Sequence, residues 1–357
     1  MTVDLFEVRQ KIKTEAENLG FTHIGIAPST PPPHYQQYLS WIENGLQADM
    51  NYLSRPDAVA KRGNPQQVLA GCRRIISLVM PYQPPQHALE PVPPGKGRIS
   101  AYARTRDYHD LILDKLKQLE NAIRVLVEGE IQIKSYVDTG PILERSYASL
   151  AGIGISGKNS CLLIQGVGSF FFLAEILTDL ELPIDEPFTR DLCGTCRRCI
   201  DACPTQCILP DRTIDASRCI SYLTIENRKG IPDDLKGEIA DWAFGCDVCQ
   251  IVCPHNARNR NQTSSLGEPI LPEFLDLIEL FYADEGVFSS NFGQTPLSRA
   301  KRTGILRNAA IVLGNQKYAA ALPALKYARE HEDDPAVQDA CRWAIDQIGS
   351  PVPINPK

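Results

Sequence analysis

Two runs of cysteine carry the clearest chemical signal in this chain. The first run, CGTCRRCIDACP, spaces four cysteines as C-x2-C-x2-C-x3-C-P, at Cys193, Cys196, Cys199 and Cys203. Such short gaps let three thiolates converge on one [4Fe–4S] cubane, while the proline turns the chain so that the fourth cysteine faces a second cluster. The second run, CDVCQIVCP, adds three more, at Cys246, Cys249 and Cys253. The runs predict two iron–sulfur clusters rather than zinc or disulfides, because nine of the twelve cysteines crowd between residues 193 and 253.

Two cubanes need eight thiolates, and the runs supply seven. In the crossed arrangement of two-cluster ferredoxins, each run gives one cysteine to the other cluster. This arrangement predicts a first set of Cys193, Cys196, Cys199 and Cys253, and a second set of Cys203, Cys246, Cys249 and one more cysteine. Spacing alone leaves Cys207 and Cys219 open as the eighth ligand; we favour Cys219, because Cys207 lies only four residues from Cys203. Apolar contexts favour core thiols at Cys72, Cys161 and Cys341.

Two further stretches contain residue types used in catalysis or cofactor binding. Asp138 stands at the end of an apolar strand, where catalytic acids often face a cleft; a turn or helix-capping aspartate is the alternative. Residues 152–159, GIGISGKN, match G-x-G-x-x-G and nearly match the phosphate-binding G-x-x-x-x-G-K-[ST] pattern. Asn159 replaces the required hydroxyl, and the preceding segment has a helical pattern where both motifs need a strand. Nucleotide binding is therefore disfavoured, although the loop and its lysine suit another phosphate-bearing or planar cofactor.

The elements that must position these residues follow from the hydrophobic pattern. Before the first cysteine run we expect helices over residues 3–19, 38–46, 108–126 and 141–150, and strands over 21–26, 73–80, 131–137, 161–164 and 170–177. After residue 270 we expect helices over 297–314, 319–331 and 335–348, resembling short HEAT-like repeats, with an ordinary helical bundle as the alternative. The expected fold class is α+β in three parts: an N-terminal α/β domain (1–185), a ferredoxin-like domain with two clusters (186–267) and a helical HEAT-like domain (268–357).

Charge is unevenly distributed along the chain. The net charge is −6, yet residues 286–329 contain no Asp or Glu and hold seven cations: Arg299, Lys301, Arg302, Arg307, Lys317, Lys326 and Arg329. Binding to a phosphate backbone requires basic charge concentrated in this way, whereas a solvated helix face usually mixes both signs. We therefore expect a polyanionic partner. The chain shows no signal-peptide pattern and no apolar run of roughly 18 residues, so a cytoplasmic location without a membrane is expected.

At this level of detail the chain resembles the epoxyqueuosine reductases, which complete queuosine synthesis at the wobble position of tRNA. The resemblance covers nearly the whole chain. It rests on KRGNP at 61–65, GRISAY at 97–102, DYH at 107–109, VDTGP at 137–141, GIGISGKN at 152–159, CISYLT at 219–224, GCDVCQIVCPHN at 245–256, the first cysteine run and the C-terminal helices. It implies an oxidoreductase with a cobalamin-binding N-terminal domain, a two-cluster ferredoxin-like domain and a tRNA-binding C-terminal domain.

The resemblance also implies roles for single residues. It makes Cys219 the eighth thiolate, leaves Cys207 spare and makes Asp138 the proton donor. Positions expected to bind the corrinoid are Arg62, Tyr102, Asp138, Lys158, Ser169, Ser221, Arg228, Cys246 and Asp247. Positions expected to contact tRNA are Arg145, Arg299, Lys301, Arg302 and Arg307. The Asp-x-His-x-x-Gly motif that supplies a histidine to cobalt is missing from the sequence, so base-off cobalamin is implied.

The expected reaction follows from these parts. An external donor of the flavodoxin or ferredoxin type reduces the clusters, which reduce cobalamin toward Co(I), and Asp138 donates a proton from a carboxyl of raised pKa. The expected substrate is a tRNA with a GUN anticodon carrying epoxyqueuosine, bound by a monomer. Two other functions fit part of the pattern. A dehalogenase-like cobalamin reductase is disfavoured by the basic segment and the missing export signal, and a ferredoxin-type carrier leaves residues 1–185 unexplained.

Overall fold

The N-terminal part of the molecule is built on a four-stranded sheet in the order β1-β2-β7-β4. The structure is a computed structural model that describes residues 4–88, 90–127, 129–257 and 263–350. The strands are β1 (His23–Pro28), β2 (Arg74–Pro81), β7 (Phe171–Thr178) and β4 (Ile133–Tyr136). All three pairings are antiparallel. The expected α/β character of residues 1–185 is therefore wrong, because alternation of helices and strands in the sequence does not fix strand direction.

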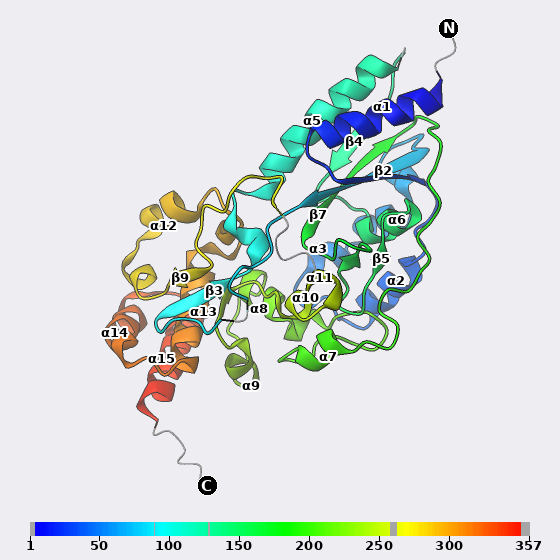
Figure 1. Cartoon of the computed structure of the whole chain (residues 1–357). Helices are drawn as coiled ribbons and strands as arrows, with labels where there is room; N and C mark the ends of the chain where they lie inside the picture. The colour runs from blue at the N-terminus through cyan, green and yellow to red at the C-terminus, as the bar shows by residue number, and fades with distance from the viewer. Residues whose placement is uncertain (1–3, 89, 128, 258–262, 351–357) are drawn as a thin grey trace.

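Helices cover both faces of this sheet. On one face, α1 (Leu5–Asn18) and α5 (Tyr108–Leu126) pack against each other (Figure 1). Apolar residues recur every three to four positions on both helices, and together with β2 and β7 they form one buried core. The opposite face is covered by α6 (Glu144–Leu150), which packs on β1, β2 and β7. A short hairpin of β5 (Ile155–Ser156) and β6 (Leu162–Leu163) follows it.

Short helices carry the surroundings of both cysteine runs. The first run forms α7 (Arg198–Ala202), which packs against α10 (Val248–Ile251) of the second run. Between and after them lie α8 (Ile220–Ile225), α9 (Asp233–Lys236) and α11 (Pro254–Ala257). Three other short helices, α2 (Tyr35–Glu43), α3 (Asn51–Ser54) and α4 (Pro56–Gly63), follow β1. Since α7 and α10 touch, the two runs meet in space although about 40 residues separate them.

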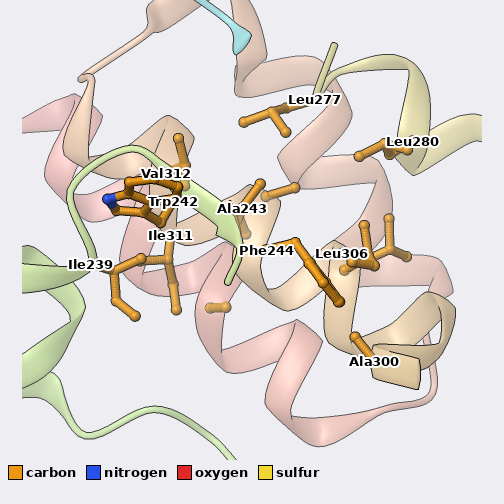
Figure 2. Close-up of a cluster of buried hydrophobic side chains, with 14 of the residues drawn as sticks. Ile239, Trp242, Ala243, Phe244, Leu277, Leu280, Ala300, Leu306, Ile311 and Val312 are labelled. Atoms are coloured by element: carbon orange, nitrogen blue, oxygen red, sulfur yellow. The ribbon is translucent and has the colours of Figure 1, made fainter. Parts of the chain in front are cut away.

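A second sheet joins the three parts expected to be separate domains. β3 (Lys96–Ile99) pairs in parallel with β8 (Trp242–Phe244) and antiparallel with β9 (Phe274–Asp276). One apolar core continues from this sheet into the C-terminal helices; Figure 2 shows Phe244, Leu277 and Leu306 within it. Segments on both sides of the boundaries expected at residues 185 and 267 therefore contribute to one sheet and one core.

The C-terminal part is helical, as expected. It contains α12 (Glu285–Phe292), α13 (Lys301–Asn315), α14 (Leu322–His331) and α15 (Pro335–Gly349). The predicted helix over 297–314 begins with a 3-10 turn, Pro296–Ala300, before α13. Ten consecutive residues of α13, Ile305–Gly314, are buried, and the helix packs against both α15 and β8. Among the described residues no helix is long and apolar enough to span a membrane.

Candidate active site and cysteine centres

Four cysteines from both runs line one cavity. Cys193, Cys196 and Cys199 of the first run share it with Cys253 of the second. The backbone N–H of Lys158 donates to Cys193 Sγ at 3.4 Å, and Lys158 Nζ donates to the carbonyl oxygens of Gly194 at 2.7 Å and Cys196 at 2.9 Å. The Gly-rich loop therefore holds the first cysteine run. These two hydrogen bonds occupy the ammonium group of Lys158, which was expected to bind the corrinoid.

A second group of four cysteines, Cys203, Cys219, Cys246 and Cys249, is half-buried. Burial raises the pKa of the Cys246 thiol, and the nearby Cys219 and Cys203 raise it further. The neighbouring Cys161, burial, and the charges of Cys246 and Cys219 raise the pKa of Cys249. The structure thus brings together cysteines of both runs in each group, while the division into two sets of cluster ligands stays a prediction. No three His, Cys, Asp or Glu side chains in the described part of the chain are grouped so as to hold a single metal ion, whereas each thiolate of a cubane binds a different iron.

Two further thiols adjoin the second group. Cys207 Sγ lies 3.5 Å from Cys203 Sγ, and Cys207 also interacts with Cys219. Cys161 interacts with Cys249, so its assignment to the apolar core is wrong. Its sequence neighbours are apolar, but β6 begins only at the next residue and leaves its side chain outside the core. The other two predicted core thiols, Cys72 and Cys341, are completely buried.

Asp138 lies in a polar cluster at the end of β4. Its Oδ2 accepts a hydrogen bond from the Tyr108 hydroxyl at 2.7 Å. His109 Nε2 lies 3.7 Å and an Arg299 terminal nitrogen 3.8 Å from the same oxygen. Tyr108 is positioned by the first turn of α5 and by stacking on Phe172 of β7, with ring centroids 4.0 Å apart. The Asp138 side chain remains 51% exposed, so a substrate can reach it.

The proton in this cluster resides on His109. Burial opposes its charge, but the hydrogen bond with Asp107 and the nearby carboxylate of Asp138 raise the pKa of His109 to about 9. Burial alone would raise the pKa of Asp138, but the neighbouring His109, the hydrogen bond from Tyr108 and the charge of Arg299 lower it. The expectation of a raised pKa at Asp138 is therefore wrong. The sequence reasoning about a strand-end aspartate did not reveal this neighbouring imidazolium.

Arg299 belongs to this cluster as well. Its Nε lies 2.7 Å from Glu226 Oε1, and Tyr52 of α3 is close enough to interact with it. Arg228, expected at the corrinoid, donates to the Arg299 carbonyl oxygen at 2.5 Å. Arg299 therefore places its charge against Asp138 and Glu226.

Two other cations of the basic segment, Arg302 and Arg307, are neutralised or buried. Arg302 donates to Glu332 Oε2 at 2.8 Å, and both side chains are 13% exposed. Arg307 is 2% exposed and donates to the carbonyl oxygens of Asn227 at 2.8 Å and Leu223 at 2.6 Å. The expectation that Arg307 contacts tRNA is wrong, because its guanidinium holds loops together inside the molecule. Residues 286–329 lack acids, but acids from other segments fold against them. Lys301 is exposed, as is Arg145, which donates to the Ser160 carbonyl oxygen.

The remaining expected cofactor positions fall into two kinds. Asp247 is 1% exposed, and its Oδ2 accepts the Ala101 N–H at 2.7 Å, which positions the next residue, Tyr102. Ser169 is 5% exposed and donates to Gln250 Oε1 at 2.9 Å. These two buried residues support the site by holding neighbouring groups in place. Ser221 is half-buried on α8, and Arg62 on α4 lies over the Tyr38 ring, 5.8 Å from its centroid.

Crossed cysteine sets beside an acid–imidazole–guanidinium cluster define an iron–sulfur oxidoreductase. Residues 62–139 match the family model described as epoxyqueuosine reductase QueG, DUF1730, and residues 192–256 match a 4Fe-4S double cluster binding domain. The epoxyqueuosine reductase of Aliivibrio fischeri is 37% identical over 100% of this chain and 96% of its own length. That of Escherichia coli is 35% identical over 97% of this chain and 90% of its own length. The chain therefore belongs to the epoxyqueuosine reductase family.

Solved structures agree with this assignment. An epoxyqueuosine reductase crystallised with an epoxyqueuosine-modified tRNA-Tyr stem loop has a TM-score of 0.87 and 28% identity, covering 97% of this chain and 92% of that one. A structure of the Bacillus subtilis enzyme has a TM-score of 0.87 and 28% identity, covering 98% of this chain and 92% of its own. In that structure the catalytic loop bearing an aspartate is swung out of the active site.

Proposed function

We propose that this chain reduces epoxyqueuosine in tRNA to queuosine, with two [4Fe–4S] clusters and cobalamin as cofactors. The observation that carries this proposal is the assembly of two crossed cysteine sets and the Asp138 cluster in one family member. Converting the epoxide to the alkene takes two electrons and two protons and releases one water. The cysteine centres supply a route for the electrons, and the Asp138–His109 pair supplies a proton.

The thiol sets fit the clusters, because each unites four cysteines from distant segments. Cys193, Cys196, Cys199 and Cys253 would hold one cubane, and Cys203, Cys219, Cys246 and Cys249 the other. Reduction by an external protein of the flavodoxin or ferredoxin type is consistent with the first set, whose flanking residues Gly194, Arg197 and Arg198 are exposed.

Tyr102 supports a place for cobalamin between the second set and Asp138. Burial raises the pKa of its hydroxyl, and the charges of Arg299, Asp138, Asp247 and Glu226 also act on it; Asp247 is the neighbour of Cys246. Tyr102, Ser221, Arg228 and Cys246 would contact the group, while Ser169 and Asp247 would hold the backbone around it. When bound, cobalamin supplies a metal centre that takes electrons singly from clusters and passes them to the substrate. His109 is engaged by Asp107 and Asp138, so no protein histidine is assigned to cobalt.

The chain's own residues supply and transfer the proton. Asp138 Oδ2, facing solvent, accepts hydrogen bonds from Tyr108 and stands beside protonated His109. A leaving oxygen at this position can take one proton from His109 by way of Asp138, which leaves His109 neutral and Asp138 ionised as before. Arg145 and Lys301 are exposed cations available to the phosphates of an anticodon stem loop with a GUN sequence.

The test uses anaerobically purified enzyme with both clusters, cobalamin, a low-potential reductant and tRNA carrying epoxyqueuosine. We expect queuosine in the wild-type reaction and at least a hundredfold lower kcat in Asp138→Asn, the size typical for a lost general acid. Cluster content and the visible spectrum of bound cobalamin should be the same in both proteins. Absence of queuosine with a fully loaded wild-type enzyme would refute the proposal.

A further inference from the structure

A completely buried acid lies behind the Asp138 loop. Glu175, in the middle of β7, is 0% exposed, and among the described residues neither of its carboxyl oxygens has a well-formed hydrogen bond. In the antiparallel register it stands opposite Ser77 of β2 and Tyr136 of β4. The Ser77 hydroxyl is likewise buried without a partner in this part of the chain. An ionised carboxylate is very costly in such a place, so Glu175 must be protonated.

Glu175 faces a second acid, Glu144, at the start of α6. The neighbouring residues on the same sheet face, Ile75 and Leu177, pack in the apolar core beneath α6, which directs the Glu175 carboxyl toward this helix. Burial, and next the charge of Glu144, raise the pKa of Glu175. Burial, together with the Asp138 charge, raises the pKa of Glu144 to about 8, while exposed Arg145 acts in the opposite direction. Both carboxyl groups therefore favour the neutral form.

Glu144 in turn holds the backbone of Asp138. Its Oε1 accepts the Asp138 N–H at 2.9 Å. Asp138 has φ of 56°, in the left-handed region that a residue with a Cβ seldom adopts without support. The Tyr108 hydroxyl fixes the carboxylate and Glu144 fixes the amide, so together they hold the loop in the position described here. The Bacillus subtilis relative, whose corresponding catalytic loop is swung out, shows that a loop of this kind can leave the site.

We propose that Glu144 holds the Asp138 loop in place as a positioning residue, while the buried Glu175 behind it stays neutral. A neutral Glu144 still accepts the Asp138 N–H through its Oε1. A lone ionised glutamate at residue 144 would accept the same hydrogen bond but would set a second negative charge beside Asp138. The inference rests on the proposed function only in taking Asp138 as the residue that must be positioned.

The decisive measurement is hydrogen–deuterium exchange of the peptide over residues 136–142 in the cluster-loaded full chain. Glu144→Met fills the space without an acceptor, and its exchange should rise about tenfold, the size expected for one lost hydrogen bond. Glu144→Gln keeps an acceptor and is the matched control, and Glu175→Gln imitates the protonated acid. Both should stay within about threefold of wild type, since each keeps the amide acceptor.

Turnover gives the second readout. In Glu144→Met we expect kcat for queuosine formation to fall about tenfold, with KM for tRNA, cluster content and cobalamin binding unchanged. Glu144→Gln should restore kcat. Unchanged exchange in Glu144→Met would overturn the proposal, as would equal losses in Glu144→Met and Glu144→Gln, which would indicate a merely structural role. Should Glu144→Met not fold, Glu144→Ala is the second acceptor-free variant. The exchange experiment needs no substrate, so a wild type without turnover would refute the proposed function and leave this assignment separately testable.

Discussion

His109 Nε2 lies 3.7 Å from Asp138 Oδ2, and the imidazole holds the proton that the carboxylate lacks. Asp107 makes this possible, because its Oδ1 lies 2.8 Å from His109 Nδ1 and fixes the ring between two carboxylates. The catalytic acid proposed from the sequence therefore belongs to a row of three side chains, Asp107, His109 and Asp138. The protonation of this group depends on pH because the histidine titrates.

Removing the Asp107 charge should change the pH dependence of turnover. The pKa of His109 is raised to about 9, so the cation is present at lower pH and is lost as the pH rises through that value. We expect wild-type kcat to decline above about pH 9, and the decline in Asp107→Asn to begin one to two units lower. The check is a pH profile of queuosine formation with cluster content measured at each pH. Identical alkaline limbs in both proteins would count against His109 as the proton store.

The Glu144 carboxyl predicts a pH-dependent stability. The pKa of Glu144 in the folded chain is about 8, above its ordinary value of 4.5. Stability from this group is therefore fully present below about pH 4.5 and is lost as the pH rises toward 8, with a slope of up to about 1.4 kcal/mol per unit. Glu144→Gln removes this loss. Its melting temperature should match that of the wild type near pH 5 and exceed it by several degrees at pH 8. Melting curves measured across that range test this. A difference in melting temperature that does not change with pH would contradict the role given to Glu144.

The assignment of the eighth thiolate predicts unequal effects of two neighbouring cysteines. Cys219→Ala should lose the second cluster, giving about half the iron and sulfide of the wild type, because each cubane requires four thiolates. Cys207→Ala should keep both clusters, and Cys161→Ala should do the same, since neither completes a set. Iron analysis with EPR of the reduced protein measures this. Loss of a cluster in Cys207→Ala together with retention in Cys219→Ala would reverse the assignment.

Two cations of the basic segment should behave differently when mutated. Lys301→Glu should weaken tRNA binding and lower the slope of log Kd against log salt by about one, because an exposed phosphate contact is lost. Arg307→Met should destabilise the fold by about 2–4 kcal/mol, because buried carbonyl oxygens lose their donor. Its folded fraction should bind tRNA with the wild-type salt slope. Salt-dependent binding titrations and denaturant unfolding distinguish the two cases.

Sequence patterns predicted the local elements better than their arrangement. The helix expected over 108–126 has those bounds, and the strand expected over 73–80 is displaced by one residue. The start of the first helix was expected at Val3, which lies outside the described residues. β3, β8 and β9 were missed because each has only three or four residues and pairs across more than 130 positions. Such pairings leave no periodic signal.

In the candidate site, too, local features were predicted better than contacts between distant segments. Spacing identified the cysteine sets, because ligand geometry is local within each run. The roles of Arg299 and Arg307 could not be read locally, since their partners Glu226 and Asn227 lie about 70–80 positions away. Glu175 did leave a signal: a single carboxylate within the apolar strand FFLAEILT. Such an isolated acid on a buried strand requires an explanation that alternation alone does not provide.

The three-stranded sheet has a consequence for the modularity of the molecule. β3 leaves the N-terminal part and lies between β8, which precedes the second cysteine run, and β9, which follows it. A fragment cut at residue 185 or 267 would expose the edge of this sheet and open the core that contains Phe244 and Leu306. The segment that carries the cysteine runs is therefore not expected to fold when it is cut out alone or exchanged between homologues as a separate unit.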